Sequence, residues 1–363
     1  MPFAYYMPVR IVAGEDCVKK NAALFAPFGA RALVVTGKSS AKNGALEDIA
    51  YALGRNGQTF AVYDKIEPNP SVASVKEGAA LARSFGADFI VAAGGGSPMD
   101  AAKAVALCAR QEVGDIFTHP IEGDVLPMVH IPTTAGTGSE VTPYSILTDD
   151  AGQTKRSISA PQLFPKLAFL DGKYMADLPQ QVTVNTALDA ISHAVEGMLS
   201  VRGGALTDAL ARESLRLLLG AYPALRLGKY TLQDRQTLLY GATLAGMVIA
   251  ATGTTPVHGM GYSLTYFHGV PHGRANGLLL PAFLEACMQK IPARMQEVVA
   301  ALGMDIPAFA HKVAVLLGRR EAYNDKTLQD YAARAAKNRN VANCLAHFSE
   351  EDLLAVLRRS VGG

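Results

Sequence analysis

The feature that most constrains the fold is an alternation of short apolar runs with helical patterns in the first half of the chain. The apolar, β-branched runs lie at 32–36, 59–63, 88–93 and 125–132, and the helical patterns lie at 43–53, 71–85 and 97–109. Strands that alternate with helices of this length pair in parallel and are covered on both faces. The sequence therefore predicts an α/β domain with a parallel sheet.

The pattern changes after about residue 171, where long helical segments replace the alternation. These segments are predicted at 184–199, 207–217, 232–251 and 281–302. We therefore expect an α/β domain over 1–178 and an all-helical domain over 179–363. Since ligands of open parallel sheets bind beyond the carboxyl ends of the strands, the expected site is a cleft between the two domains.

Composition narrows the class of protein. The 363 residues include 34 basic and 32 acidic side chains without a long run of either sign, which gives no electrostatic reason to expect nucleic acid as a partner. No apolar run reaches the roughly 18 residues of a membrane helix, and the N-terminus lacks a signal-peptide pattern. The four cysteines are widely spaced, which is typical of reduced thiols. We expect a soluble, cytoplasmic protein.

A glycine-rich turn, GGGSPMD at 94–100, directly follows the apolar run at 88–93. Glycine permits positive φ and lets the backbone approach a bulky anion. Ser97 suits the N-cap of the following helix, Pro98 its first position, and Asp100 the third position of a capping-box-like pair. The free N–H groups of that helix would then face a pyrophosphate. The alternative is a plain, well-capped turn, because GGGS is not the GxGxxG fingerprint.

A second run of small and hydroxyl residues, PTTAGTGSE at 132–140, begins where the 125–132 run ends. It would offer hydroxyls and backbone amides at the carboxyl edge of the sheet, although an ordinary polar loop is the alternative. Two such loops after two strands of one sheet favour a nucleotide site more than either loop alone.

Four side chains in the second half of the chain have the chemistry of metal ligands. Asp189 and His193 stand four residues apart in a helical stretch, so they project from one face. His258 and His272 follow in PVHG (256–259) and VPHG (270–273), among small residues that would permit close approach of a cofactor. A carboxylate and three imidazoles would hold Fe²⁺ or Zn²⁺ without a thiolate. The alternatives are a surface Asp–His pair and ordinary core histidines.

Together these motifs resemble the iron-containing (group III) alcohol dehydrogenases, in the superfamily that also holds glycerol dehydrogenase and dehydroquinate synthase. The matching segments are GGGSPMDAAK (94–103), PTTAGTGSEVTPYSI (132–146), ALDAISHAVEG (187–197) and VHGMGYSL…GVPHGRANGLLLP (257–281). The resemblance implies a dehydroquinate synthase-like fold, with a Rossmann-like dinucleotide-binding domain followed by an all-helical metal-binding domain. It also implies hydride transfer between NAD(P)(H) and a small alcohol, diol or aldehyde.

The resemblance further implies which residues bind the metal and the cofactor. The implied ligands of Fe²⁺, with Zn²⁺ as the alternative, are Asp189, His193, His258 and His272. The residues implied near the pyrophosphate and nicotinamide ribose are Gly95, Gly96, Ser97, Asp100, Thr133, Thr134 and Thr137, and further positions near the cofactor are Asn69 and Lys155. Because the family often forms dimers through its N-terminal strands, the segment FAYY (3–6) could serve that purpose, and we expect a homodimer or larger homo-oligomer.

Two positions depart from the family pattern. Tyr262 stands four residues after His258, where many members have a histidine. His268 is the candidate proton relay in its place, although an ordinary loop residue is the interpretation we favour there.

The second departure is Gly37, which follows the first predicted strand where NAD-dependent members often have an aspartate. An acidic residue binds the ribose 2′-hydroxyl and repels a 2′-phosphate. The segment from Gly37 through Lys38 and Ser39 to Ser40 instead offers space, a cation and two hydroxyls, so we expect NADP(H) to be preferred, with NAD(H) as the alternative.

Two other functions fit parts of the sequence. A metal-dependent cyclase or lyase of the dehydroquinate synthase type needs several basic side chains around a phosphorylated acid, whereas Arg274 is the nearest basic residue to the ligand segments. A non-catalytic nucleotide- or metal-binding protein would have no reason to keep the full ligand set and both cofactor loops.

Overall fold

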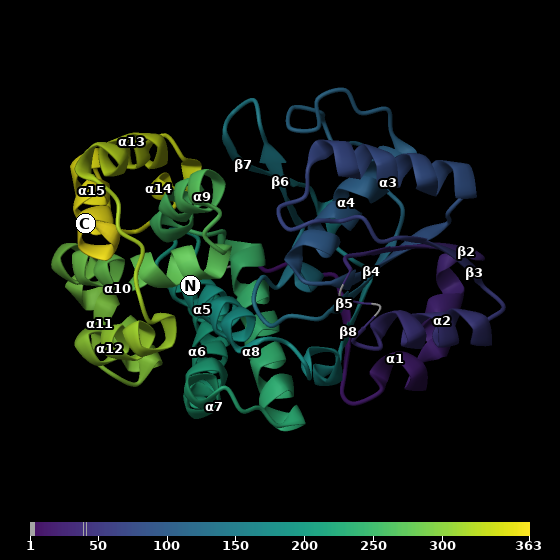
Figure 1. Cartoon of the computed structure of the whole chain (residues 1–363), viewed down its shortest axis with the longest axis horizontal. Helices are drawn as coiled ribbons and strands as arrows, with labels where there is room; N and C mark the ends of the chain where they lie inside the picture. The colour runs from purple at the N-terminus through teal and green to yellow at the C-terminus, as the bar shows by residue number, and fades with distance from the viewer. Residues whose placement is uncertain (1–3, 39, 41) are drawn as a thin grey trace. The chain divides into compact units, whose positions relative to one another are not determined.

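The computed structural model describes residues 4–38, 40 and 42–363 (Figure 1). Ser39, which we expected near the cofactor, and Phe3 of the expected dimer segment lie outside the described residues. The chain forms two compact units. The sheet unit comprises 7–178 and 231–239, and the helical unit comprises 179–230, 240–363 and the N-terminal segment that ends at Tyr6. Tyr5 of that segment donates a hydrogen bond from its hydroxyl to the carbonyl of Met247, at 3.3 Å.

The sheet unit is built on a six-stranded sheet with the strand order β1-β8-β5-β4-β2-β3. The strands are β1 (Arg10–Ala13), β2 (Arg31–Thr36), β3 (Thr59–Tyr63), β4 (Phe89–Gly94), β5 (Met128–Pro132) and β8 (Leu167–Leu170). All neighbouring strands pair in parallel. This sheet confirms the predicted Rossmann-like fold class.

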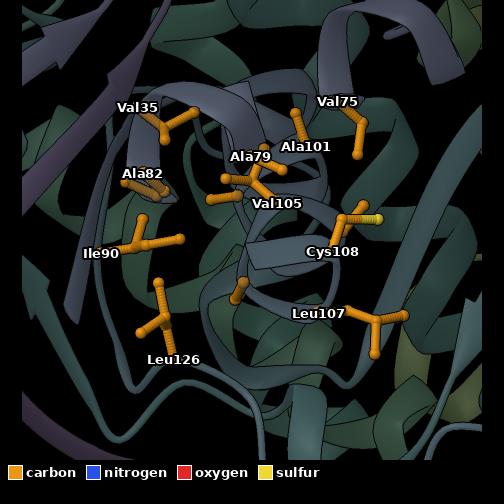
Figure 2. Packing of buried hydrophobic residues seen from close by; sticks show 14 of the residues in the cluster. Val35, Val75, Ala79, Ala82, Ile90, Ala101, Val105, Leu107, Cys108 and Leu126 are labelled. Carbon is orange, nitrogen blue, oxygen red and sulfur yellow. The ribbon is translucent and has the colours of Figure 1, made fainter. Parts of the chain in front are cut away.

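Helices cover both faces of the sheet because its central strands are apolar on both sides. On one face, Val34, Val91 and Val129 pair across β2, β4 and β5 and belong to a single buried cluster. That face is covered by α1 (Cys17–Lys20), η1 (Ala22–Phe28) and α2 (Ala45–Arg55). Val35 and Ile90 belong to the cluster on the other face, under α3 (Val72–Phe85) and α4 (Gly96–Arg110) (Figure 2).

The order of the strands creates a switch point between β2 and β4. From β2 the chain passes through α2 to β3 at the sheet edge, and from β3 it returns through α3 to β4 on the other side of β2. Right-handed crossovers in opposite directions place α2 and α3 on opposite faces. The carboxyl ends of β2 and β4 therefore flank the place where open α/β sheets bind ligands.

A hairpin that we did not predict follows the second small-residue loop. Its antiparallel strands are β6 (Tyr144–Asp149) and β7 (Thr154–Ser159). Short 3-10 turns complete the unit: η2 (Ser139–Val141), η3 (Pro161–Leu163) and η4 (Gly172–Met175).

The helical unit contains the long helices predicted for the second half. They are α5 (Gln180–Met198), α6 (Ala205–Gly220), α7 (Tyr222–Leu227), α8 (Leu232–Thr252), α9 (Pro256–His268), α10 (His272–Lys290), α11 (Pro292–Leu302), α12 (Ile306–Leu317), α13 (Asp325–Ala336), α14 (Arg339–Ala342) and α15 (Glu350–Val361). The first turns of α8 belong to the sheet unit. The prediction of one helix over 281–302 is wrong. Pro292 has no N–H to continue the hydrogen-bond ladder, so it starts α11 instead.

Across the described part of the chain, no single helix has the length and apolar character to cross a membrane. Two pairs of consecutive helices, α8 with α9 and α11 with α12, are together long and apolar enough to cross one, but they bend by 109° and 52° at their breaks.

Candidate functional site

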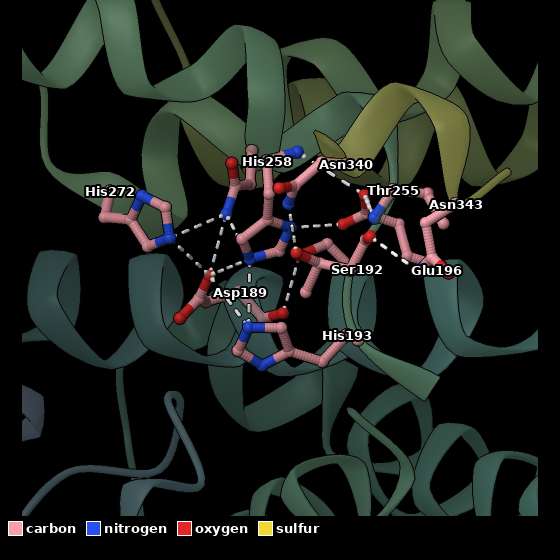
Figure 3. A network of polar contacts seen from close by, with 12 residues as sticks. Asp189, Ser192, His193, Glu196, Thr255, His258, His272, Asn340 and Asn343 are labelled. Atoms are coloured by element: carbon pink, nitrogen blue, oxygen red, sulfur yellow. Dashed lines mark hydrogen bonds and ion pairs between the residues drawn. The ribbon is translucent and has the colours of Figure 1, made fainter. Parts of the chain in front are cut away.

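The four predicted metal ligands face one another in the helical unit (Figure 3). The carboxylate oxygen Oδ1 of Asp189 lies 3.9 Å from His193 Nε2 and 3.7 Å from the Nε2 atoms of both His258 and His272. The Nε2 atoms of His193 and His258 are 2.9 Å apart. The arrangement arises because α5 carries the first pair one turn apart, while α9 and α10 each contribute one imidazole.

These distances fit a shared divalent cation. A tetrahedral ion with bonds of about 2.1 Å holds its ligand atoms about 3.4 Å apart. The ligand atoms of Asp189, His258 and His272 lie within 4.8 Å of one another, and His193 Nε2 adjoins two of them. Asp189, His193 and His258 are buried, whereas the His272 side chain is 27% exposed. A small molecule would therefore approach the cluster from the side of His272.

The charges of the cluster favour a cation. Burial alone would raise the pKa of Asp189, but the imidazoles of His193, His272 and His258 hold it well below its usual range. Burial alone would lower the pKa of His258, but the carboxylates of Glu196 and Asp189 outweigh this effect and raise it to about 10. The two buried carboxylates thus stabilise positive charge here, which either protons or a metal ion supply.

Two residues that we did not predict complete this cluster. Asn276 Nδ2 donates to Asp189 Oδ1 at 2.9 Å and lies 3.1 Å from His258 Nε2 and 3.2 Å from His272 Nε2. Glu196 Oε2 contacts His258 Nδ1. Helical spacing was the available signal, because Glu196 stands seven residues after Asp189 on α5 and Asn276 four residues after His272 on α10.

Glycine permits the close packing that brings the predicted ligands together. A Cβ at Gly273 would lie 1.9 Å from the carbonyl oxygen of Asn185 on α5, and a Cβ at Gly261 would lie 2.5 Å from Asn276 Oδ1. We expected the small residues around the histidines to admit a cofactor, but at these two positions they admit a neighbouring helix.

Tyr262, which stands in place of the family histidine, and His268, the candidate proton relay, lie in different surroundings. The Tyr262 ring stacks on His272, with centroids 5.8 Å apart and planes 15° apart. His268 is the last residue of α9 rather than a loop residue, so our favoured interpretation of it as a loop residue is wrong. Its Nε2 lies 2.7 Å from the Tyr331 hydroxyl, and its ring packs on Tyr323 at 4.2 Å.

The predicted cofactor residues gather at the carboxyl edge of the sheet. Because β3, β2, β4 and β5 are neighbouring parallel strands, the segments that follow them open on the same edge. The predicted residues in these segments are Asn69 after β3, Gly37 and Lys38 after β2, Gly95 and Gly96 after β4, and Thr133, Thr134 and Thr137 after β5.

The two small-residue loops contact each other directly. Gly94 has φ +152°, a conformation that favours glycine, and its carbonyl accepts a hydrogen bond from Thr133 N at 2.9 Å. A Cβ at Gly95 would lie 3.1 Å from Thr134 Oγ1, and one at Gly96 would lie 2.6 Å from Thr137 Cγ2. The glycines therefore let the second loop pack against the start of α4.

The predicted capping of α4 is wrong. The helix starts at Gly96, Gly95 occupies the N-cap, and no side chain among the residues that the structure describes caps it. The backbone conformation of the glycine turn starts the helix before Ser97, whose Oγ instead accepts a hydrogen bond from Asn69 N at 3.3 Å. Asn69 has φ +61°, and its carbonyl accepts from Thr148, which pairs with Lys155 across the hairpin.

Asp100 is buried and braces the second loop instead of capping the helix. Its Oδ1 accepts from Ser139 Oγ at 2.5 Å and its Oδ2 from Ile146 N at 3.0 Å. The fully buried Lys103 donates to Ser139 Oγ and to the Tyr144 carbonyl, both at 2.7 Å. Burial lowers the pKa of Lys103 to about 8, against the opposing effect of Asp100 and Glu140. This pair ties α4 to the loop that follows β5.

Comparison with known proteins defines the class of this protein. The family model for iron-containing alcohol dehydrogenase matches residues 8–172, and that for the C-terminal region of the Fe-containing alcohol dehydrogenase family matches 183–361. The chain belongs to the iron-containing alcohol dehydrogenase family. This confirms the predicted class of enzyme, a metal-dependent alcohol dehydrogenase or aldehyde reductase linked to a nicotinamide cofactor.

Individual relatives agree with this assignment. Lactaldehyde reductase from Escherichia coli K12 is 32% identical over 281 residues, which are 76% of this chain and 73% of that protein. 1,3-Propanediol dehydrogenase from Klebsiella pneumoniae is 33% identical over 302 residues, or 81% and 76% of the two chains. The crystal structure of an iron-containing alcohol dehydrogenase from Thermotoga maritima has a TM-score of 0.92 and 36% identity, and the match covers 100% of both chains.

Proposed function

We propose that the chain binds Fe²⁺ through Asp189, His193, His258 and His272 and interconverts a small alcohol or diol with its aldehyde or ketone. The observation that carries the proposal is the convergence of three imidazoles on one buried carboxylate oxygen. Relatives named lactaldehyde reductase and 1,3-propanediol dehydrogenase support a short, hydroxylated substrate.

The proposed centre would serve this chemistry through its charge. When bound, the cation supplies a Lewis acid for the substrate oxygen, and the nicotinamide ring accepts or donates the hydride. Asp189 and three neutral imidazoles neutralise only half of a divalent charge, so this ligand set favours an anionic substrate oxygen beside it. His272 stands on the exposed side of the cluster, where the substrate would enter.

We propose that the dinucleotide binds to the sheet unit at the loops after β2, β4 and β5. The first N–H groups of α4 would hold the pyrophosphate, because a helix N-terminus attracts anions. Thr134 and Thr137, which pack on Gly95 and Gly96, would line the same place. In this proposal 1–178 is the dinucleotide-binding domain and 179–363 the metal-binding domain.

NADP(H) is the proposed preferred cofactor. Lys38 is exposed at the end of β2, where a 2′-phosphate would lie. A Cβ at Gly37 would lie 3.3 Å from the Ile66 carbonyl, so an acidic side chain at this position would crowd that oxygen. A higher kcat/KM with NADH than with NADPH would contradict the preference.

A cytoplasmic location, a homodimer and a proton relay through His268 stay predictions. The relay has less support than the metal site, because His268 Nε2 already pairs with the Tyr331 hydroxyl. The cyclase alternative also has less support, because the Arg274 guanidinium is held by Glu321 and by the carbonyls of Leu317 and Arg319.

The decisive experiment is metal analysis of anaerobically purified protein, followed by an aldehyde panel with NADH and NADPH. We expect one bound Fe²⁺ per chain and oxidation of the cofactor with short aldehydes. His272→Ala should lose both the metal and the turnover. Full metal content and full turnover in His272→Ala would refute the ligand assignment, and phosphate release from a sugar-phosphate acid would indicate the cyclase instead.

A further inference from the structure

The side chain of Glu196 is a fully buried carboxylate whose two oxygens have different partners (Figure 3). Its Oε1 accepts hydrogen bonds from Thr255 N at 2.8 Å and Thr255 Oγ1 at 2.9 Å, and His258 N lies 3.4 Å away. Its Oε2 contacts Nδ1 of the His258 ring. One glutamate on α5 thus binds both the first turn of α9 and the imidazole that α9 contributes to the ligand cluster.

These partners determine which nitrogen of the His258 ring carries a hydrogen. Backbone N–H groups can only donate, so the atom that faces Thr255 N must be an acceptor. The remaining oxygen of an ionised carboxylate is also only an acceptor, so the His258 nitrogen opposite it must carry a hydrogen. A neutral imidazole with hydrogen on Nδ1 has its lone pair on Nε2. That Nε2 lies 3.7 Å from Asp189 Oδ1 and 2.9 Å from His193 Nε2.

We propose that Glu196 is a positioning residue that holds His258 in the Nδ1–H tautomer and thereby presents Nε2 to the metal. The inference rests on the proposed ligand set. Glu196 itself is not a ligand in this proposal, because its oxygens are engaged by Thr255 and by the far nitrogen of the ring. Carboxylates that accept from the second nitrogen of a ligating histidine orient the ring and raise its affinity for the metal.

The substitution Glu196→Gln tests the tautomer without changing the shape of the side chain. A glutamine must keep its only oxygen toward Thr255 N, which leaves its NH₂ group facing His258 Nδ1. Nδ1 is then favoured as an acceptor and the ring hydrogen is favoured on Nε2, so a cation must displace that hydrogen before Nε2 can bind it. We expect the affinity for Zn²⁺ alone, measured by chelator competition without cofactor or substrate, to fall by about 10–100-fold.

A matched control is Glu213→Gln, since Glu213 is an exposed glutamate of the same unit that pairs with Arg216. It should leave the Zn²⁺ affinity unchanged. If His258→Ala loses Zn²⁺ binding but Glu196→Gln binds Zn²⁺ as tightly as the wild type, this inference is overturned while the proposed ligand set stands. A wild type that binds no metal would instead overturn the proposed function.

Wild-type protein supplies a second measurement that needs no Glu196 variant. NMR of the Zn²⁺-loaded protein with ¹⁵N-labelled histidine should show a protonated Nδ1 and a metal-bound Nε2 for His258. The His258 signals are assigned by their absence from the spectrum of His258→Ala. Coordination through Nδ1, or a hydrogen on Nε2, would refute the proposal even if Glu196→Gln fails to fold.

Discussion

The contact between α5 and α10 predicts that Gly273→Ala disrupts the metal centre. The added Cβ would lie 1.9 Å from the Asn185 carbonyl oxygen and 2.9 Å from Asp189 Cβ, whereas ordinary contacts of a Cβ begin at 3.4 Å. Relief of the clash with Asn185 therefore requires the helices to separate by about 1.5 Å, since the clashing atoms belong to two backbones and no rotamer change can relieve it.

The separation would act directly on two of the proposed ligands. Gly273 follows His272, and Asn185 lies one turn before Asp189, whose Oδ1 is 3.7 Å from His272 Nε2. Metal–ligand distances tolerate changes of only about 0.2 Å, so a shift of this size exceeds the tolerance several-fold. We expect Zn²⁺ affinity to fall at least about 10-fold, or 1.4 kcal/mol. Overpacking should also lower the free energy of unfolding of the metal-free protein by about 1–3 kcal/mol.

Urea denaturation followed by circular dichroism and chelator competition measure the two effects. Gly220→Ala is the control, because Gly220 ends α6 and an added Cβ there would meet no atom within 4 Å among the described residues. This control should keep wild-type metal affinity and should not lower the free energy of unfolding, because alanine favours a helix over glycine. A Gly273→Ala protein with wild-type values of both would refute the close packing of α5 on α10 as the basis of the centre.

Three further predictions concern charge and cofactor binding. Asp189→Asn should reduce bound iron, measured by elemental analysis, because it removes the negative charge that three imidazoles face, whereas the exposed Asp325→Asn should keep it. Lys103→Met should raise the KM for the nicotinamide cofactor about 10-fold with unchanged metal content, because it breaks the hydrogen bonds that tie α4 to the second loop. Lys76→Met, at an exposed lysine, should leave this KM unchanged. An unchanged KM in Lys103→Met would contradict the role of Lys103. Lys38→Ala should lower kcat/KM with NADPH and spare that with NADH, and an equal loss with both would exclude a 2′-phosphate contact.

Local periodicity explains why much of the site could be predicted. A separation of four residues on one helix places Asp189 and His193 on a common face, whatever surrounds that helix. Apolar runs that alternate with helical patterns likewise require a parallel sheet, and its loops then share one edge. The N-cap of α4 was predicted wrongly, because the ends of a helix depend on a few backbone angles and shift by one or two residues. The break before α11 was missed although Pro292 is a local signal for the start of a helix.

The sequence by itself determined the parallel sheet, the helical second half and the kinds of side chain in the proposed metal site, because these follow from residue chemistry and short-range spacing. Only the tertiary structure decided that Glu196 meets His258, that Asn276 adjoins three of the proposed ligands, and that Asp100 and Lys103 brace a loop some 40 residues away. Each of these contacts joins residues from different elements, and the contacts in the metal-binding cluster also depend on how closely α5 and α10 pack at Gly273, which no local pattern specifies.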